Sequence, residues 1–230
     1  MKKIQDIQDL NEKKVLLRLD LNIPLKKKVI LDETRIDKIL PVINFLIKKK
    51  AKIIILSHIG RPNGKVVPEL SMKPVCENLE RKINQKINLF TEDIRKIKTE
   101  DLFKNFNDNI VVLENIRFYS EEEENDLNFA KHLATLGDIY VNDAFSCSHR
   151  SHASVSNITK FLPSYAGLQL SSEVTALQKI TTNIKKPVTC IIGGSKISTK
   201  IGIIENLIPN FDNIVFVGGM ANNILKFKKF

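Results

Sequence analysis

Cysteine is scarce in this 230-residue sequence: Cys76, Cys147 and Cys190 lie far apart and form no CxxC pair. An odd number of isolated cysteines supports neither a disulfide framework nor a zinc site, so we expect a reducing, cytoplasmic setting. Long apolar runs are also absent, since runs such as Ile53–Leu56 are far shorter than the roughly 20 residues of a membrane-spanning helix. Residues 1–14 contain no apolar segment like that of a secretory signal. The composition therefore predicts neither a membrane partner nor secretion.

Aromatic residues make up only 7% of the chain, although its formal net charge is +10. Much of the positive charge is lysine in short runs such as 26–28 and 48–50. Because no aromatic residues interleave with these runs, as base stacking would require, we expect a solvated surface and no nucleic-acid partner. The acidic run Glu121–Glu124 is likewise predicted to be solvated. With 43% hydrophobic and 27% charged residues, the chain has the composition of a folded globular protein.

Short β-branched segments alternate along the chain with longer helical patterns. Apolar residues recur every three or four positions over 36–47, which predicts an amphipathic helix. Most predicted strands are continuous apolar runs, as expected when helices cover both faces of a parallel sheet. The order predicts an α/β fold, with a three-layer, Rossmann-like N-terminal domain followed by the beginning of a second α/β domain. The predicted strands are Val15–Leu19, Lys52–Leu56, Ile87–Phe90, Ile110–Leu113, Asp138–Val141, Val188–Ile192 and Ile214–Val217.

A long connection rich in Ser, His and Asn, residues 143–165, interrupts this alternation. A helical stretch over 168–182 follows, and Pro187 opens a new strand. The chain is therefore predicted to divide into a first domain over 1–165, an interdomain helix and linker over 166–186, and the incomplete start of a second domain over 187–230.

Polar residues gather where the predicted strands end. In an open parallel sheet, ligands bind at the carboxyl ends of the strands, so these residues are candidates for one site. They are Asp20 and Asn22, Ser57–Pro62, Glu114–Arg117, Asn142 and Asp143, and Gly193–Lys196.

Arginine is rare, with seven residues against 29 lysines. In such a composition an arginine is expected where its planar fork grips a carboxylate or phosphate in bidentate fashion. Taken singly, each is more often expected to form a surface or interface ion pair. Four of them, however, lie at predicted strand or helix ends, which favours an anionic, phosphorylated substrate: Arg35, Arg61, Arg117 and Arg150.

The histidines divide into different expected roles. His58 follows a strand and precedes Gly-Arg, which favours a ligand contact, whereas His132 sits in a helical pattern and is predicted to be structural. His149 and His152 are spaced like a metal pair, but no carboxylate or cysteine completes a tetrahedral set, so no metal site is predicted. No Ser or Cys lies in a nucleophile elbow, so the sequence gives no support for hydrolase triad chemistry.

The loop Gly193–Lys196 matches neither the Walker A pattern nor GxGxxG, and a Gly-Gly pair alone is compatible with a simple tight turn. Lys196 and Lys200, however, lie four residues apart at a predicted helix start, so their ammonium groups share one face near the helix N-terminus. This arrangement favours polyphosphate binding. Cationic groups with no base–nucleophile pair suit phosphoryl transfer between oxygens that are already ionised.

Seven longer motifs follow one another along the chain. They are RLDLNIP at 18–24, DETRI at 32–36, SHIGRP at 57–62, ENIRF at 114–118, VNDAFSCSHRSHAS at 141–154, GGSKISTK at 193–200 and GGMA at 218–221. Together they make the chain resemble the phosphoglycerate kinase family, over essentially all of its length but over only about the first half of the family's chain.

The resemblance implies a monomeric glycolytic enzyme that moves a phosphoryl group between 1,3-bisphosphoglycerate and ADP, giving 3-phosphoglycerate and ATP. It implies a substrate domain followed by a nucleotide domain, with Mg²⁺ as cofactor and the protein ligand of Mg²⁺ beyond residue 230. The implied substrate-binding residues are Asp20, Leu21, Asn22, Arg35, His58, Ile59, Gly60, Arg61, Arg117 and Arg150. The implied nucleotide-binding residues are Gly193, Gly194, Lys196, Lys200, Gly218 and Gly219. Arg35 and Lys196 are the implied catalytic residues.

The sequence departs from the family pattern at a few positions. Ser195 and Thr199 stand where the family often has Ala and Asp. Val217 occupies the first place of a usual triple glycine, where a side chain could crowd the nucleotide. Asn157 stands where glycine is common. The alternative reading is a non-catalytic phosphate-binding or interaction protein built on a truncated kinase domain.

Overall fold

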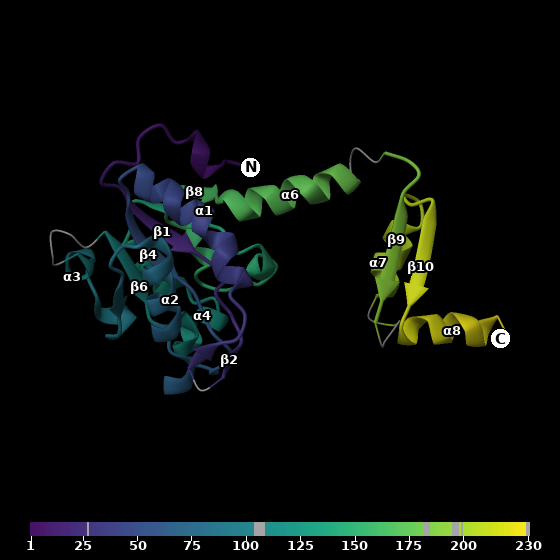
Figure 1. Cartoon of the computed structure of the whole chain (residues 1–230), viewed down its shortest axis with the longest axis horizontal. Helices are drawn as coiled ribbons and strands as arrows, with labels where there is room; N and C mark the ends of the chain where they lie inside the picture. The colour runs from purple at the N-terminus through teal and green to yellow at the C-terminus, as the bar shows by residue number, and fades with distance from the viewer. Residues whose placement is uncertain (27, 104–108, 182–184, 195–197, 199, 229–230) are drawn as a thin grey trace. The chain divides into compact units, whose positions relative to one another are not determined.

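The computed structural model describes residues 1–26, 28–103, 109–181, 185–194, 198 and 200–228. The chain forms two compact units, Met1–Glu173 and Val174–Phe230, and each is described by itself. The division falls inside helix α6 (Leu168–Thr181), within the predicted linker of 166–186 (Figure 1).

The first unit is built on a six-stranded parallel sheet with the strand order β5-β6-β4-β1-β7-β8. Its central strands are short apolar runs, and three of the four side chains after Lys14 in β1 are aliphatic and fully buried. The strands are β1 (Lys14–Arg18), β4 (Lys52–Leu56), β5 (Asn88–Phe90), β6 (Ile110–Leu113), β7 (Ile139–Asn142) and β8 (Ser164–Ala166).

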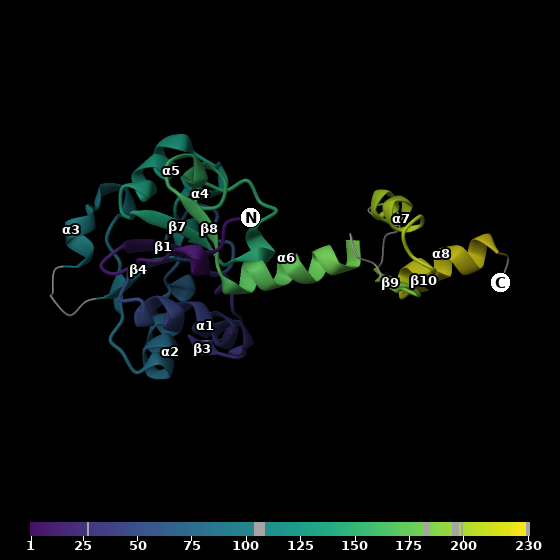
Figure 2. The same cartoon turned by 90° about the horizontal axis from the view of Figure 1, so that it is seen from above.

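Helices cover both faces of this sheet, so the predicted three-layer α/β fold is confirmed (Figure 2). Along β4, Ile53 and Ile55 belong to one apolar cluster and Ile54 to the other, as the alternation of strand side chains requires. The first cluster packs against α1 (Thr34–Lys48) and α2 (Lys73–Ile83), and the second packs against α5 (Leu127–Ala134).

Shorter elements connect these layers. An antiparallel pair is formed by β2 (Leu25–Lys26) and β3 (Val29–Ile30), and two single-turn helices are α3 (Thr99–Leu102) and α4 (Ser120–Glu123). Short 3-10 turns span Ile4–Asp6, Pro68–Leu70, Ile94–Lys96, Ile116–Phe118, Phe145–Cys147 and Asn157–Lys160.

All seven predicted strands occur, shifted by at most one residue at either end. The sequence did not indicate β8, because three residues are too few to show a period and this edge strand pairs with β7 alone among the named strands. The N-terminal segment lies beside it: Lys3 forms a parallel bridge with Ala166, and the Ala166 amide donates to the Lys2 carbonyl at 2.8 Å.

The second unit pairs β9 (Thr189–Gly193) in parallel with β10 (Asn213–Val217), together with α7 (Ile201–Leu207) and α8 (Gly219–Phe227). Among the described residues of this unit, Ile192 and Met220 are the only buried apolar side chains. Nearly all of the buried core therefore belongs to the first unit. Across the described part of the chain, every helix is too short or too polar to cross a membrane.

Candidate functional site

The candidate site of the first unit lies at the carboxyl edge of its sheet. Because β1, β4, β6 and β7 run parallel, the loops that follow them emerge on the same edge. Asp20, His58, Arg117 and Asp143 follow these four strands in turn, as the sequence predicts.

Arg35 is presented by the first turn of α1. Its guanidinium pairs with the Asp20 carboxylate, which also accepts a hydrogen bond from the Ser146 hydroxyl. The Arg35 side chain is 46% exposed, so the ion pair orients the cation without covering it. These residues line a cavity of about 210 Å³.

The loops after β1 and β4 are tied together by Asn22, whose Oδ1 accepts from the Gly60 amide at 2.9 Å. Gly60 has φ +65°, a conformation that favours glycine, and a Cβ there would lie 2.9 Å from Leu70 Cδ2, so that the Leu70 side chain would have to shift. The side chains of Leu21 and Ile59 are buried in the apolar core. Any contact of these two residues with a ligand would therefore come from the backbone.

Arg117 is a nearly dehydrated cation, with a side chain only 2% exposed. Its Nη1 donates to the Gly60 carbonyl at 3.0 Å, and its Nε lies 3.4 Å from the Glu123 carboxylate. Its Nη2 has no hydrogen-bond partner among the described residues. Burial lowers the pKa of Arg117, Arg150 lowers it further, and Glu123 opposes the shift. The guanidinium thus retains an unused donor in a positive environment.

Asn115 fixes the turn that carries Arg117. Its Oδ1 accepts from the Arg117 amide at 3.1 Å, and its Nδ2 donates to the Ile59 and Leu70 carbonyls at 2.8 and 2.9 Å. One fully buried amide side chain therefore holds three segments of the site in place.

His58 is 3% exposed, and its Nδ1 lies 3.2 Å from Arg18 Nη2. Burial lowers the pKa of His58 to about 2, with further lowering by Arg18, Arg117 and Arg150. His58 is therefore neutral at physiological pH.

Arg61 is exposed and Arg150 is half-buried. Within the described ranges, no side-chain hydrogen bond or ion pair occupies either guanidinium.

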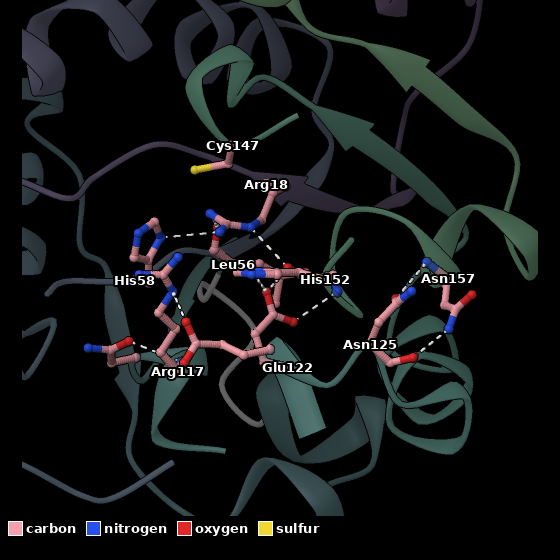
Figure 3. A network of polar contacts seen from close by, with 12 residues as sticks. Arg18, Leu56, His58, Arg117, Glu122, Asn125, Cys147, His152 and Asn157 are labelled. Carbon is pink, nitrogen blue, oxygen red and sulfur yellow. Dashed lines mark hydrogen bonds and ion pairs between the residues drawn. The ribbon is translucent and has the colours of Figure 1, made fainter. Parts of the chain in front are cut away.

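A buried network that the sequence did not indicate lies behind His58 (Figure 3). Arg18 Nε donates to Ser154 Oγ at 3.0 Å, and Ser154 donates to Glu122 through both its hydroxyl, at 2.7 Å, and its amide, at 2.9 Å. Arg18 and Glu122 are each 0% exposed. The prediction that Glu121–Glu124 is solvated is thus wrong for Glu122, because its carboxylate compensates the buried charge of Arg18.

Asp143 connects this edge of the sheet to α6. Its Oδ1 accepts from the Leu170 amide at 2.8 Å, which caps the helix, and a Cβ on Gly167 would lie 2.4 Å from the carboxylate. Asp143 is 2% exposed, and burial raises its pKa to about 6.

Replacing Asp143 by asparagine is expected to change how stability depends on pH. Because the folded pKa of about 6 exceeds the unfolded value near 3.9, the contribution of Asp143 to the stability of the native protein falls as pH rises from about 4 to 6. Asparagine keeps an acceptor for Leu170 but does not ionise. Relative to wild type, the variant should gain about 2 kcal/mol in free energy of unfolding between pH 4 and pH 7, measured by urea denaturation. A difference that is the same at both pH values would contradict the assignment.

In the second unit, glycines gather where β9 and β10 end. Lys200 Nζ donates to the Gly193 carbonyl at 2.8 Å, and the Met220 amide donates to the Gly194 carbonyl at 3.0 Å. Gly218, with φ +65°, leads into Gly219, the first residue of α8. The predicted residue Lys196 lies outside the described residues, as do Ser195 and Thr199, two positions that depart from the family pattern.

Val217 and Asn157, the departures that lie within the described residues, both have structural partners. Val217 Cγ2 would lie 2.8 Å from a Cβ on Gly193, so this valine fills space that glycine leaves open. Asn157 Nδ2 donates to the Asn125 carbonyl at 2.6 Å.

His132 bonds the Ile94 carbonyl through Nε2 at 2.8 Å, in keeping with a structural role. In the described ranges, no three His, Cys, Asp or Glu side chains gather to hold a metal ion.

Comparison with known proteins gives consistent results. The family model described as phosphoglycerate kinase matches residues 4–230. The phosphoglycerate kinase of Wolbachia sp. subsp. Drosophila simulans is 48% identical over 221 residues, which are 96% of this chain and 55% of the relative. That of Bartonella bacilliformis is 48% identical over 214 residues, or 93% and 53%. The structure of phosphoglycerate kinase from Coxiella burnetii superposes with a TM-score of 0.88 at 37% identity, covering 99% of this chain and 57% of that one. The chain spans about half the length of these relatives.

Proposed function

This chain belongs to the phosphoglycerate kinase family, and from that premise we propose that it serves reversible phosphoryl transfer between 1,3-bisphosphoglycerate and ADP, giving 3-phosphoglycerate and ATP, in glycolysis. We further propose that it acts as a cytoplasmic monomer. In this proposal the first unit binds the phosphoglycerate and residues from 187 onward belong to the nucleotide domain.

The observation that carries the proposal is the buried Arg117 guanidinium with its unused Nη2 donor. Burying a guanidinium costs desolvation free energy, and an anionic ligand that accepts a hydrogen bond from Nη2 would compensate that cost. 3-Phosphoglycerate carries a carboxylate and a phosphate, which are the two groups that a guanidinium binds in bidentate fashion. The remaining proposed contacts are Asp20, Asn22, Arg35, His58, Arg61 and Arg150, with backbone contacts from Leu21, Ile59 and Gly60.

We propose that the nucleotide phosphates bind Gly193, Gly194, Lys200, Gly218 and Gly219, with Lys196 contacting the transferring group. Peptide amides at glycine turns allow close approach of phosphate, and Lys200 adds a positive charge. Mg²⁺ would accompany the nucleotide, because it is usually bound through substrate phosphates, waters and one or two carboxylates. Among the described residues, no cluster of three or more His, Cys, Asp or Glu side chains could hold this ion.

The proposed chemistry asks these side chains to position and neutralise rather than to exchange protons. The attacking oxygen of ADP or of the carboxylate is already ionised at neutral pH, so no general base is needed. Arg35 is the proposed catalytic residue of the first unit. The ion pair with Asp20 keeps the Arg35 guanidinium oriented, while nearly half of the Arg35 side chain remains exposed to a ligand.

The proposal is tested by calorimetric titration of the 230-residue chain with 3-phosphoglycerate. We expect saturable binding that Arg35→Met weakens about 10- to 100-fold, because one charge-assisted contact worth about 1.5–3 kcal/mol is lost. Arg81→Met is the matched control, since Arg81 is exposed on α2 and contacts the Glu77 carbonyl in its own helix. Absence of binding by the folded wild type, or equal affinities of the wild type and a folded Arg35→Met variant, would contradict the proposal.

A further inference from the structure

Arg18 is the last residue of β1, and its guanidinium is enclosed on every side. Nη1 donates to the Leu19 carbonyl and lies 3.5 Å from the Leu56 carbonyl, Nε donates to Ser154 Oγ, and Nη2 lies 3.2 Å from His58 Nδ1 (Figure 3). A guanidinium has donors and no acceptor. His58 Nδ1 must therefore be the acceptor, which requires that this ring nitrogen carry no proton.

This contact fixes the chemical form of His58. A neutral imidazole with an unprotonated Nδ1 carries its proton on Nε2. Among the described residues, no hydrogen bond occupies Nε2, which is therefore available as a donor at the carboxyl edge of the sheet.

We propose that Arg18 is a positioning residue that holds His58 as the neutral Nε2–H tautomer, so that His58 donates one hydrogen bond to the anionic substrate without adding a charge. The identity of that substrate rests on the proposed function, whereas the tautomer does not.

Ser154 and Glu122 hold Arg18 in this role. Ser154 accepts from Arg18 and donates to Glu122, so the three side chains form a directed chain of hydrogen bonds. Burial raises the pKa of Glu122, but His152, Arg18 and Ser154 outweigh that effect and hold it below its usual range. Glu122 is therefore a carboxylate that balances Arg18.

Among the described residues, the charged groups that shift the pKa of His58 act in the same direction. Arg18 from β1, Arg117 from the 116–118 turn, and Arg150 and His152 from the loop after β7 all disfavour an imidazolium. The carboxylates nearby are engaged elsewhere, Glu122 by Ser154 and Glu123 by Arg117. His58 thus stays neutral although it lies among cations that attract anions.

The tautomer is directly measurable by long-range ¹H–¹⁵N NMR of histidine-labelled protein, with His58 assigned from a His58→Ala variant. In wild type we expect a protonated Nε2 and an unprotonated Nδ1, unchanged from about pH 5.5 to pH 8. An Nδ1–H form or an imidazolium at neutral pH would overturn the proposal. This measurement needs no substrate, so it remains decisive even if 3-phosphoglycerate does not bind.

Removing the donor should release His58. In Arg18→Met we expect signals of both tautomers and a titration that moves toward the ordinary pKa near 6.5, with no change in Arg81→Met. If Arg18→Met does not fold because Glu122 is left unpaired, Arg18→Met/Glu122→Met removes both charges and takes its place. A folded variant in which His58 keeps the pure Nε2–H form would refute the positioning role.

The affinity for 3-phosphoglycerate is a second measurement, and it distinguishes a positioning role of Arg18 from a general loss of structure. Arg18→Met should weaken 3-phosphoglycerate binding about tenfold, as loss of one oriented hydrogen bond predicts. In a His58→Ala background the same substitution should have almost no further effect, because Arg18 acts through His58. Additive losses would show that Arg18 acts independently of His58 and would overturn the proposal.

Discussion

Replacing Arg117 by methionine is expected to lower the affinity for 3-phosphoglycerate about 100-fold while leaving the first unit at least as stable as wild type. In the free protein Arg117 is desolvated with only partial compensation from Glu123, so its removal relieves a cost of folding. In the proposed complex with 3-phosphoglycerate the same change removes a buried charge-assisted pair, worth about 3 kcal/mol or two decades of affinity. Binding and stability should therefore respond in opposite directions.

Calorimetric titration and thermal unfolding measure the two effects on the same protein. Arg95→Met is the control, because Arg95 is an arginine of the same unit that pairs with Asp93 and Glu121 on the surface. That control should retain its affinity. If Arg117→Met binds 3-phosphoglycerate as tightly as wild type does, Arg117 does not contact the ligand.

Replacing Glu122 by methionine is expected to reduce the free energy of unfolding of the first unit by about 3–5 kcal/mol. The substitution leaves the Arg18 guanidinium, which is 0% exposed, without its compensating carboxylate. It also removes the acceptor of two hydrogen bonds from Ser154. Urea denaturation followed by a signal from the first unit measures the loss.

A neighbouring position in the same acidic run gives the matched control. Glu121 pairs with Arg95 near the surface, with its side chain 28% exposed, so Glu121→Met should cost only about 0–1 kcal/mol. The double variant Arg18→Met/Glu122→Met should recover much of the loss, because two apolar side chains then replace a charged pair. Equal losses at Glu121 and Glu122 would show that Glu122 does not compensate a buried charge.

The location of the site was predictable because it depends on local sequence. Apolar runs identify the strands, and polar residues directly after them must lie at the same edge when the strands are parallel. Arg35 and Arg117 were identifiable as rare arginines at such positions. The position of each such residue depends only on its neighbours in the sequence.

The network behind the site was not predictable, because it depends on contacts between distant residues. Glu122 is one of four consecutive glutamates, and nothing local distinguishes it from its exposed neighbours. Its burial follows from Ser154, 32 residues away, and Ser154 in turn meets Arg18 across 136 residues. Nothing local distinguishes Arg18 either, because it ends an apolar strand, where the hydrophobic pattern outweighs a single cation.

The bridge between Lys3 and Ala166 brings the entry and exit of the six-stranded sheet to one place. A short engineered linker could therefore join these two points, and new chain ends could be opened in an exposed loop elsewhere. Circular permutation of the first unit would preserve every strand pairing while changing the order in which the strands are synthesised. Permutants of this unit would therefore reveal whether its fold depends on its connectivity, and whether β1 must be made before β7 for the sheet to assemble.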